Sequence, residues 1–297
     1  MYNPNMSAPG QLLSPFHRLW RLFGWTKHSS ILLGGFLAVI LLIGYIWWPL
    51  AEQALAYVDW DGVWWLYMDW LLLGVFLFMS LTIIARADLR TDGLIVLVGA
   101  IGGLVIESWG TQTNLWFYYT AERPPLWIIP AWPIASLSID RVTRLFAFLL
   151  EKIEKRLTKD DRPSLGRLYS LGYWFVFIAF LVLMLTFVAP TFQRSMTLMA
   201  TGLVIFLVLT PKDHRMTLLV FLAGSALGYF LERWGITRQC WTYYTFQTPP
   251  LFAVLAHGMA AVAFWRAGLA LKWGWGKVRE RVHGVFLGTK GINKTGT

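Results

Sequence analysis

Apolar residues run along this chain in blocks of about 20, and the stretches between the blocks hold most of the charged residues. A helix of about 20 apolar residues spans the ~30 Å hydrocarbon core of a bilayer, where only a helix satisfies its own backbone. The pattern therefore predicts an all-α protein, a polytopic membrane helix bundle of about eight transmembrane helices. The predicted spans are 31–50, 64–85, 93–109, 126–148, 170–190, 195–211, 216–234 and 250–272.

Composition supports a membrane protein over the soluble alternatives. Hydrophobic residues make up 57% of the 297 residues and charged residues only 14%, which excludes a disordered chain, a coiled coil and an ordinary soluble enzyme. The first apolar run, 31–50, exceeds the 7–15 residues of a signal-peptide core, and no small-residue cleavage site follows it. We therefore expect this run to remain as a membrane helix.

Positive charge predicts the orientation. The net charge is +10, but the basic residues lie between apolar spans, so the bilayer rather than nucleic acid is the expected partner. Nineteen of the 26 lysine and arginine residues fall on one predicted side and four on the other. Because basic residues favour the cytoplasmic side, both termini are predicted to be cytoplasmic, in a multi-pass protein of the cytoplasmic (inner) membrane.

An internal repeat divides the chain. Residues 107–126 and 232–251 align without a gap at an offset of 125, and 10 of the 20 positions are identical. The second to fourth spans match the sixth to eighth at this offset, which predicts two parallel four-helix repeats. The predicted segments are a cytoplasmic tail (1–30), the first repeat (31–150), a charged cytoplasmic linker (151–169), the second repeat (170–272) and a basic cytoplasmic tail (273–297).

The repeated motif carries the first candidate site. Each copy reads Gly-x-x-x-Gly-x-x-x-Glu, which places two glycines and Glu107, or two glycines and Glu232, on one helix face. Glycines at this spacing let another helix approach, so both carboxyl groups are predicted to point into a helix contact. Carboxyl groups inside a membrane span are candidate functional groups, here general acids. The alternative is structural: each glutamate would hydrogen-bond the tyrosines of its adjacent loop.

His257 is the second candidate. It lies about six residues into the last span, at a depth similar to that of Glu232, so the two are predicted to form an acid–base pair. The first repeat has Trp132 at the equivalent position, which suggests that one half is catalytic and the other structural. A hydrogen bond between helices is the alternative role for His257. The other histidines lie outside the spans or at their edges, which disfavours paired haem ligands: His17, His28, His214 and His283.

Aromatic residues around the glutamates are predicted to bind the substrate, although an aromatic belt at the membrane interface would explain them equally. Asp69 in the second span is assigned to the same site, with a bond to a Trp indole or a Tyr as its structural alternative. Arg141 and Arg266 are expected to snorkel to the inner interface. The predicted substrate-binding residues are Trp109, Trp116, Tyr118, Tyr119, Trp234, Trp241, Tyr243, Tyr244 and Asp69.

Several chemistries find no support in the sequence. The chain contains no Walker loop, no GxSxG, no HExxH and no dinucleotide fingerprint, so ATP-driven transport and Rossmann redox chemistry are not expected. Its single cysteine, Cys240, excludes an intrachain disulfide and a cysteine-based metal site. We predict neither a metal nor a cofactor.

The repeated segment resembles the integral-membrane carotenoid-biosynthesis family that includes carotenoid hydratases. The resemblance covers roughly 30 residues in each half. It rests on Glu107, Gly110, Tyr119, Thr120 and Pro124, and on Glu232, Gly235, Tyr244, Thr245 and Pro249. It implies acid-catalysed addition of water across a terminal isoprenoid double bond. A carboxylic acid would protonate the alkene, and aromatic faces would stabilise the carbocation.

The first functional hypothesis is therefore an enzyme acting on a hydrophobic, isoprenoid-like small molecule, with Glu107 or Glu232 as the acid and His257 assisting. The alternative is a non-enzymatic membrane subunit or assembly factor that binds a protein partner through its Trp- and Tyr-rich outer loops. A transporter ranks third, because the spans contain few mid-membrane polar residues.

Overall fold

The computed structural model describes residues 24–156 and 162–291, and it confirms the predicted all-α bundle. The described residues form eight helices of 15 residues or more, two three-residue strands and three short 3-10 turns. Residues 1–23, 157–161 and 292–297, from the predicted tails and linker, lie outside the described part. The helices are α2 (Lys27–Leu55), α3 (Trp70–Ile84), α4 (Leu89–Gln112), α5 (Ala131–Glu154), α6 (Arg162–Val188), α7 (Ser195–Leu209), α8 (His214–Thr237) and α9 (Leu251–Gly291). The short elements are η1 (Trp64–Leu66), β1 (Trp116–Tyr118), η2 (Leu126–Ile128), η4 (Ala189–Thr191) and β2 (Trp241–Tyr243).

By length and composition, the chain is an integral membrane protein. Five helices are long and apolar enough to cross a bilayer, namely α2, α4, α6, α8 and α9. Helices α3 and α7 are apolar but have only 15 residues each, and α5 carries Asp140, Arg141 and Arg144 near its middle. Large apolar side chains such as Leu41, Phe175 and Met199 are more than 70% exposed, as expected where lipid covers the surface.

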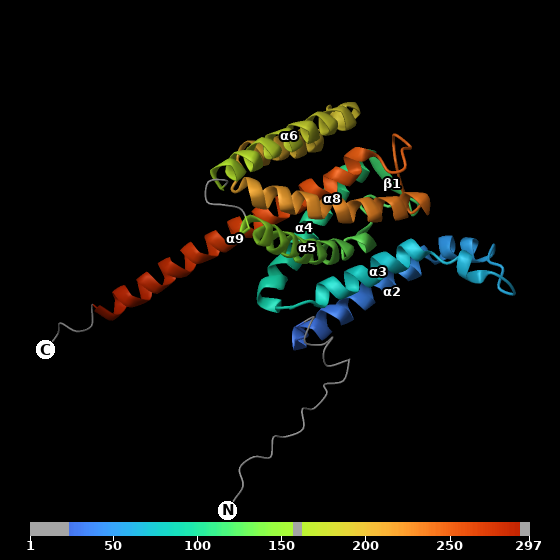
Figure 1. The fold of residues 1–297 in the computed structure, drawn as a ribbon, viewed down its shortest axis with the longest axis horizontal. Coiled ribbons are helices and arrows are strands. Elements are labelled where there is room, and N and C mark those ends of the chain that lie inside the picture. Colours follow the sequence, from blue (N-terminus) through green and yellow to red (C-terminus); the bar gives the residue numbers. More distant parts are fainter. Residues whose placement is uncertain (1–23, 157–161, 292–297) are drawn as a thin grey trace, which may run out of the picture.

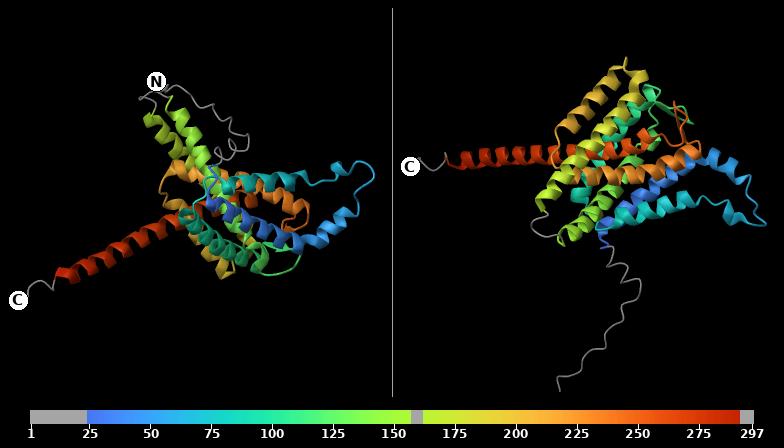
Figure 2. Two further views of the ribbon diagram at one scale, coloured as in Figure 1. Left: turned by 90° about the horizontal axis from the view of Figure 1, so that it is seen from below. Right: turned by 45° about the horizontal axis from the view of Figure 1, so that its top comes forward.

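The two halves of the chain pair their neighbouring helices in the same order. In the first half α2 packs against α3 and α4 against α5; in the second, α6 packs against α7 and α8 against α9. Across the halves, α5 contacts α8 and α4 contacts α9, so these four helices meet in the centre of the bundle (Figure 1). The pairs α2–α3 and α6–α7 lie on the outside, where they cover this central group (Figure 2).

Several helix boundaries differ from the sequence-based expectation. The second span begins at residue 70 rather than 64, because the Asp69 carboxylate caps α3 by accepting from the Leu72 N–H, and residues 64–66 form η1. The fourth span begins at residue 131, after the 3-10 turn η2. The segment predicted as a basic tail, 273–297, is helical as far as residue 291, so α9 extends well beyond the bundle (Figures 1 and 2).

A two-stranded sheet joins the halves, which the hydropathy pattern does not predict. Strand β1 pairs with β2 antiparallel, with Trp116 opposite Tyr243 and Tyr118 opposite Trp241. Residues 116 and 118 are the repeat counterparts of 241 and 243, so the register follows a pseudo-two-fold axis through the middle of the sheet. The flanking bonds obey it too: the Tyr119 N–H donates to the Cys240 carbonyl at 3.2 Å, and the Tyr244 N–H to the Leu115 carbonyl at 3.1 Å.

Arg141 does not snorkel, contrary to expectation. Its Nη2 lies 2.7 Å from Oδ2 of the fully buried Asp92, and its Nη1 lies 2.7 Å from Asp140. Its Nε donates to the Ala85 carbonyl at 3.0 Å, which ties α5 to the end of α3. The arginine therefore compensates the charge of a buried carboxylate, which would be costly to leave without a partner.

Replacing Arg141 should therefore destabilise the bundle strongly. Arg141→Met leaves Asp92 buried without its counter-charge, and breaking such a pair costs about 3–5 kcal/mol. The measurement is the thermal midpoint of the detergent-purified protein. Arg144→Met is the matched control on the same helix, because its exposed pair with Asp140 is worth only about 0–1 kcal/mol. Equal shifts for both variants would contradict a structural role for the buried pair.

Cys240 should report the integrity of the joint between the halves. Its thiol is 2% exposed beside β2, and burial raises its pKa to about 12. Because the thiolate is the reactive species, a maleimide at about pH 8 should label the folded protein slowly and the denatured protein fast. Mass spectrometry of time points measures the rate. Rapid labelling of the native protein would mean that the two strands separate readily.

Candidate functional site

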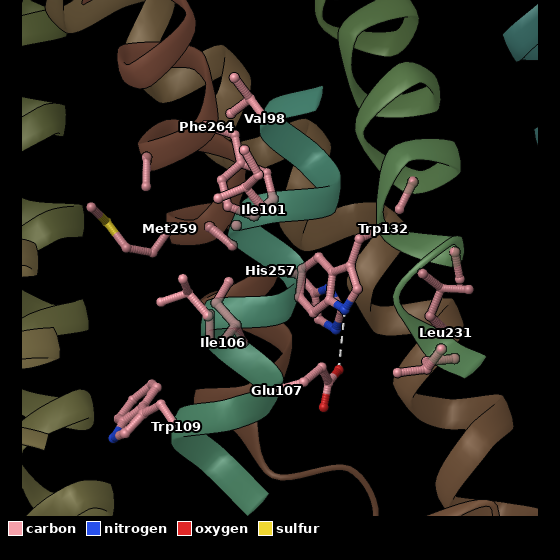
Figure 3. Close-up of a pocket in the computed structure, with 18 of the residues that line it drawn as sticks. Val98, Ile101, Ile106, Glu107, Trp109, Trp132, Leu231, His257, Met259 and Phe264 are labelled. Atoms are coloured by element: carbon pink, nitrogen blue, oxygen red, sulfur yellow. Dashed lines mark hydrogen bonds between the residues drawn. The ribbon is translucent and has the colours of Figure 1, made fainter. Parts of the chain in front are cut away.

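Glu107 lies at the centre of a hydrogen-bonded cluster in the first half. Its carboxylate, 3% exposed, accepts from Trp116 Nε1 at 3.0 Å, Tyr118 Oη at 2.9 Å and Trp132 Nε1 at 3.1 Å. The donors come from β1 and from the start of α5, whereas the glutamate comes from α4. One carboxylate therefore joins three successive elements of the repeat. Figure 3 shows the bond from Trp132.

Glu232 has the same surroundings in the second half, with one substitution. Its carboxylate, also 3% exposed, accepts from Trp241 Nε1 at 2.9 Å and from Tyr243 Oη at 2.8 Å. The third partner is His257, whose Nε2 lies 2.8 Å from Glu232 Oε1. The predicted Glu232–His257 pair is thus formed, and so are the loop contacts of the structural alternative. Its counterpart Trp132 stacks on His257 at 5.8 Å, so the two clusters touch.

Glycines make room for the aromatic donors. A Cβ on Gly110 would overlap the Trp116 indole, and one on Gly235 would overlap the Trp241 indole. Likewise, a Cβ on Gly103 or Gly228 would overlap the third partner of the same cluster, Trp132 or His257. The glycine one turn earlier serves the close helix approach that the sequence predicts, because a Cβ on Gly99 would lie 3.0 Å from Pro133 Cα.

Both clusters open onto one large apolar cavity of about 1580 Å³. One part of its wall comes from α2, α3, α5 and α8, and the repeat-related part comes from α6, α7, α9 and α4. Glu107, Glu232 and His257 line it. Figure 3 shows Glu107 and His257 among aromatic side chains that include Trp132 and Phe264. Typical pockets for small molecules measure about 300–1,000 Å³, so this cavity suits a long apolar molecule.

Trp109 and Trp234 line the cavity without contacting the glutamates. The Trp109 indole donates to Thr197 Oγ1 on α7 at 3.1 Å, and the Trp234 indole donates to Asp69 Oδ2 at 2.8 Å. Asp69 itself lies outside the cavity lining, and its second partner is Arg238 at 2.9 Å. Burial alone would raise the pKa of Asp69, but hydrogen bonds from Arg238, the Leu72 N–H and Trp234 outweigh it and lower that pKa.

Tyr119 and Tyr244 lie outside the cavity lining as well. The Tyr119 hydroxyl donates to the Ile46 carbonyl on α2, and the Tyr244 hydroxyl donates to the Phe187 carbonyl on α6 at 2.7 Å. These bonds attach the paired loops to the outer helices. The described contacts of Tyr119, Tyr244 and Asp69 join loops and helices to one another. None of these contacts favours the predicted role in substrate binding.

The tyrosine donors keep their protons. Burial and the neighbouring Glu107 hold the pKa of Tyr118 well above its usual range, and burial and Glu232 do the same for Tyr243. The indoles of the tryptophans can only donate. His257 is the one imidazole among the described partners of the two glutamates, and its Nε2 can donate or accept according to its tautomer.

Trp132 is the cluster member that motif reading did not assign to the site. It lies 25 residues after Glu107, as His257 lies 25 residues after Glu232, so the repeat offset contains the signal. No group of three His, Cys, Asp or Glu side chains that could hold a metal occurs in the described part of the chain. Comparison with known protein families, curated proteins and solved structures finds no match.

Adding a methyl group beside a donor should disrupt a cluster. Gly110→Ala pushes the Trp116 indole away from Glu107, and overpacking of this kind costs about 1–3 kcal/mol. The readouts are the thermal midpoint and the tryptophan emission of the purified protein. The control is Gly93→Ala on the same helix, where a Cβ meets nothing within 4 Å and alanine favours the helix. Indistinguishable variants would show that the indole position is not constrained.

Proposed function

We propose that this protein is a membrane enzyme that protonates a double bond of an isoprenoid-like lipid and adds water to it. The observation that carries the proposal is the Glu232–His257 pair, joined at 2.8 Å in the wall of a large apolar cavity. A proton-exchanging pair is costly to bury among apolar side chains, so such a pair at a ligand-sized cavity is a candidate acid. The resemblance to the carotenoid hydratases suggests the reaction.

The difference between the two halves assigns the roles. In the first cluster Trp132 donates to Glu107 and cannot release its proton, whereas His257 at the same place accepts or donates according to its tautomer. His257 is also the more exposed member of its pair, with 18% of its side chain accessible against 4% for Glu232. We therefore assign proton delivery to His257, with Glu232 holding the ring in position and balancing its charge.

The reaction balances with water alone. The protonated pair transfers one proton to the terminal carbon of the double bond, whose π electrons form the new C–H bond and leave a tertiary carbocation. The aromatic faces around the cavity, Trp132 among them, stabilise that cation. A water oxygen then bonds to the cationic carbon and returns a proton to the Glu232–His257 pair. The product is a tertiary alcohol, and the acid is regenerated.

One observation favours a second candidate, a partner-binding subunit. The connection between α2 and α3 has no counterpart of similar length in the second half, and it projects from the bundle (Figure 1). Its aromatic side chains are exposed, among them Tyr57, Trp60, Trp65 and Tyr67. A membrane interface would cover such a loop equally well, which is why the enzyme ranks first.

Proton delivery by the pair predicts a specific loss of turnover. In deuterated buffer, the wild type should convert an acyclic isoprenoid polyene to a deuterated tertiary alcohol, followed by mass spectrometry. Glu232→Gln and His257→Gln can each keep a hydrogen bond but cannot transfer the proton, so the rate should fall by about 10²–10⁴-fold. Tyr229→Phe, an exposed site on α8, is the control.

Two results would contradict the proposal. A wild type that holds the polyene, seen as its absorption band, yet incorporates no deuterium would exclude hydration and favour the partner-binding subunit. A His257→Gln variant with the rate of the wild type would remove His257 from the chemistry.

A further inference from the structure

The end of the cavity beside the α7–α8 loop carries two cations. Arg266 on α9 and Lys212 in the loop both line the cavity there. Arg266 lies nine residues beyond His257 on the same helix, which is about 14 Å along the axis. The cavity therefore has the Glu232–His257 pair in its wall and positive charge about 14 Å further along α9, among mostly apolar lining residues.

The first half neutralises the equivalent position. Arg141, the repeat counterpart of Arg266, pairs with Asp92 and Asp140 at 2.7 Å each. The second half has Thr217 and Trp265 where those carboxylates would stand. It also has a lysine, Lys212, where the first half has an alanine. The second half therefore lacks two negative charges at this end of the cavity, and its lysine lies one position after Pro211, the counterpart of Arg86 in the first half.

These cations are incompletely bonded within the described residues. Arg266 Nη1 donates to the Thr210 carbonyl at 2.6 Å and its Nη2 contacts Thr210 Oγ1 at 3.3 Å, so neutral groups hold one edge of the guanidinium. Its Nε has no acceptor, and no carboxylate lies within 4.0 Å of it, among the residues that the structure describes. Lys212 is exposed, and among the same described residues it forms neither a hydrogen bond nor an ion pair.

We propose that Arg266 and Lys212 bind the anionic, phosphate-type headgroup of a lipid whose chain lies in the cavity between α4, α7 and α9 and reaches His257. Guanidinium and ammonium groups are the usual ligands for phosphate oxygens. A bound anion also lowers the free-energy cost of placing these positive charges near the membrane interior. This inference rests on the proposed function for what happens to the lipid chain, namely protonation and hydration of its double bond. It adds that the substrate is an anionic amphiphile, held by its head about 14 Å from the acid.

The test uses the full-length protein in nanodiscs of neutral phosphatidylcholine. It is titrated with geranylgeranyl phosphate, with geranylgeraniol and with inorganic phosphate, and binding is measured by thermal stabilisation. The phosphate ester should bind at least about tenfold more tightly than the alcohol. Arg266→Gln and Lys212→Gln should each reduce that preference. Arg144→Gln, an exposed cation outside the cavity lining, should leave it unchanged.

Lys212→Gln keeps the test decisive if loss of the Thr210 contacts unfolds Arg266→Gln, since Lys212 supports no described contact. Equal binding of the alcohol and the ester would overturn the inference. Inorganic phosphate that binds as tightly as the ester would also overturn it, because the isoprenoid chain would then contribute nothing to the affinity.

The outcome is separable from that of the proposed function. His257→Gln should retain the preference for the phosphate ester while losing turnover. A preference without any double-bond chemistry would remove the proposed function and leave the lipid site. Hydration without a preference for the phosphate ester would remove the headgroup site and leave the proposed function.

Discussion

Two carboxylates buried in an apolar bundle are the constraint on which the rest of this structure depends. A carboxyl group without partners in such surroundings costs several kcal/mol, so Glu107 and Glu232 must each collect strong donors. The donors to Glu107 come from a strand and from the helix that follows it, whereas the accepting carboxylate comes from the preceding helix. Satisfying the two glutamates therefore brings three successive elements of each half together.

Shape complementarity makes that satisfaction possible. Each glutamate lies between two glycines whose missing side chains leave space for large rings, as Gly103 and Gly110 do for Trp132 and Trp116. The same rings form part of the cavity wall, so the groups that hold the carboxylates also define the space for a ligand. Packing and candidate chemistry thus depend on the same few positions, and a change at one alters both.

Approximate symmetry supplies the scaffold, and departures from it supply the chemistry that we propose. The β1–β2 register and the loop bonds follow one pseudo-two-fold axis, so both halves bring a carboxylate to the same cavity. The halves differ where polarity matters: Trp132 is replaced by His257, and Asp92 by Thr217. In the function that we propose, this difference between the two copies would orient a linear amphiphile, with its head at Arg266 and its chain at His257.

The sequence alone determined the helices and the repeat, because apolar length and identity at a constant offset are local properties of the chain. The pairing of Glu232 with His257 was also predictable from the sequence, because the two residues lie at similar depths in adjacent spans. The partners of Arg141, the pairing of β1 with β2 and the positions of Tyr119 and Tyr244 were decided only by the tertiary structure. Each depends on contacts between segments far apart in sequence, and hydropathy cannot distinguish an arginine that reaches the interface from one that meets a buried aspartate.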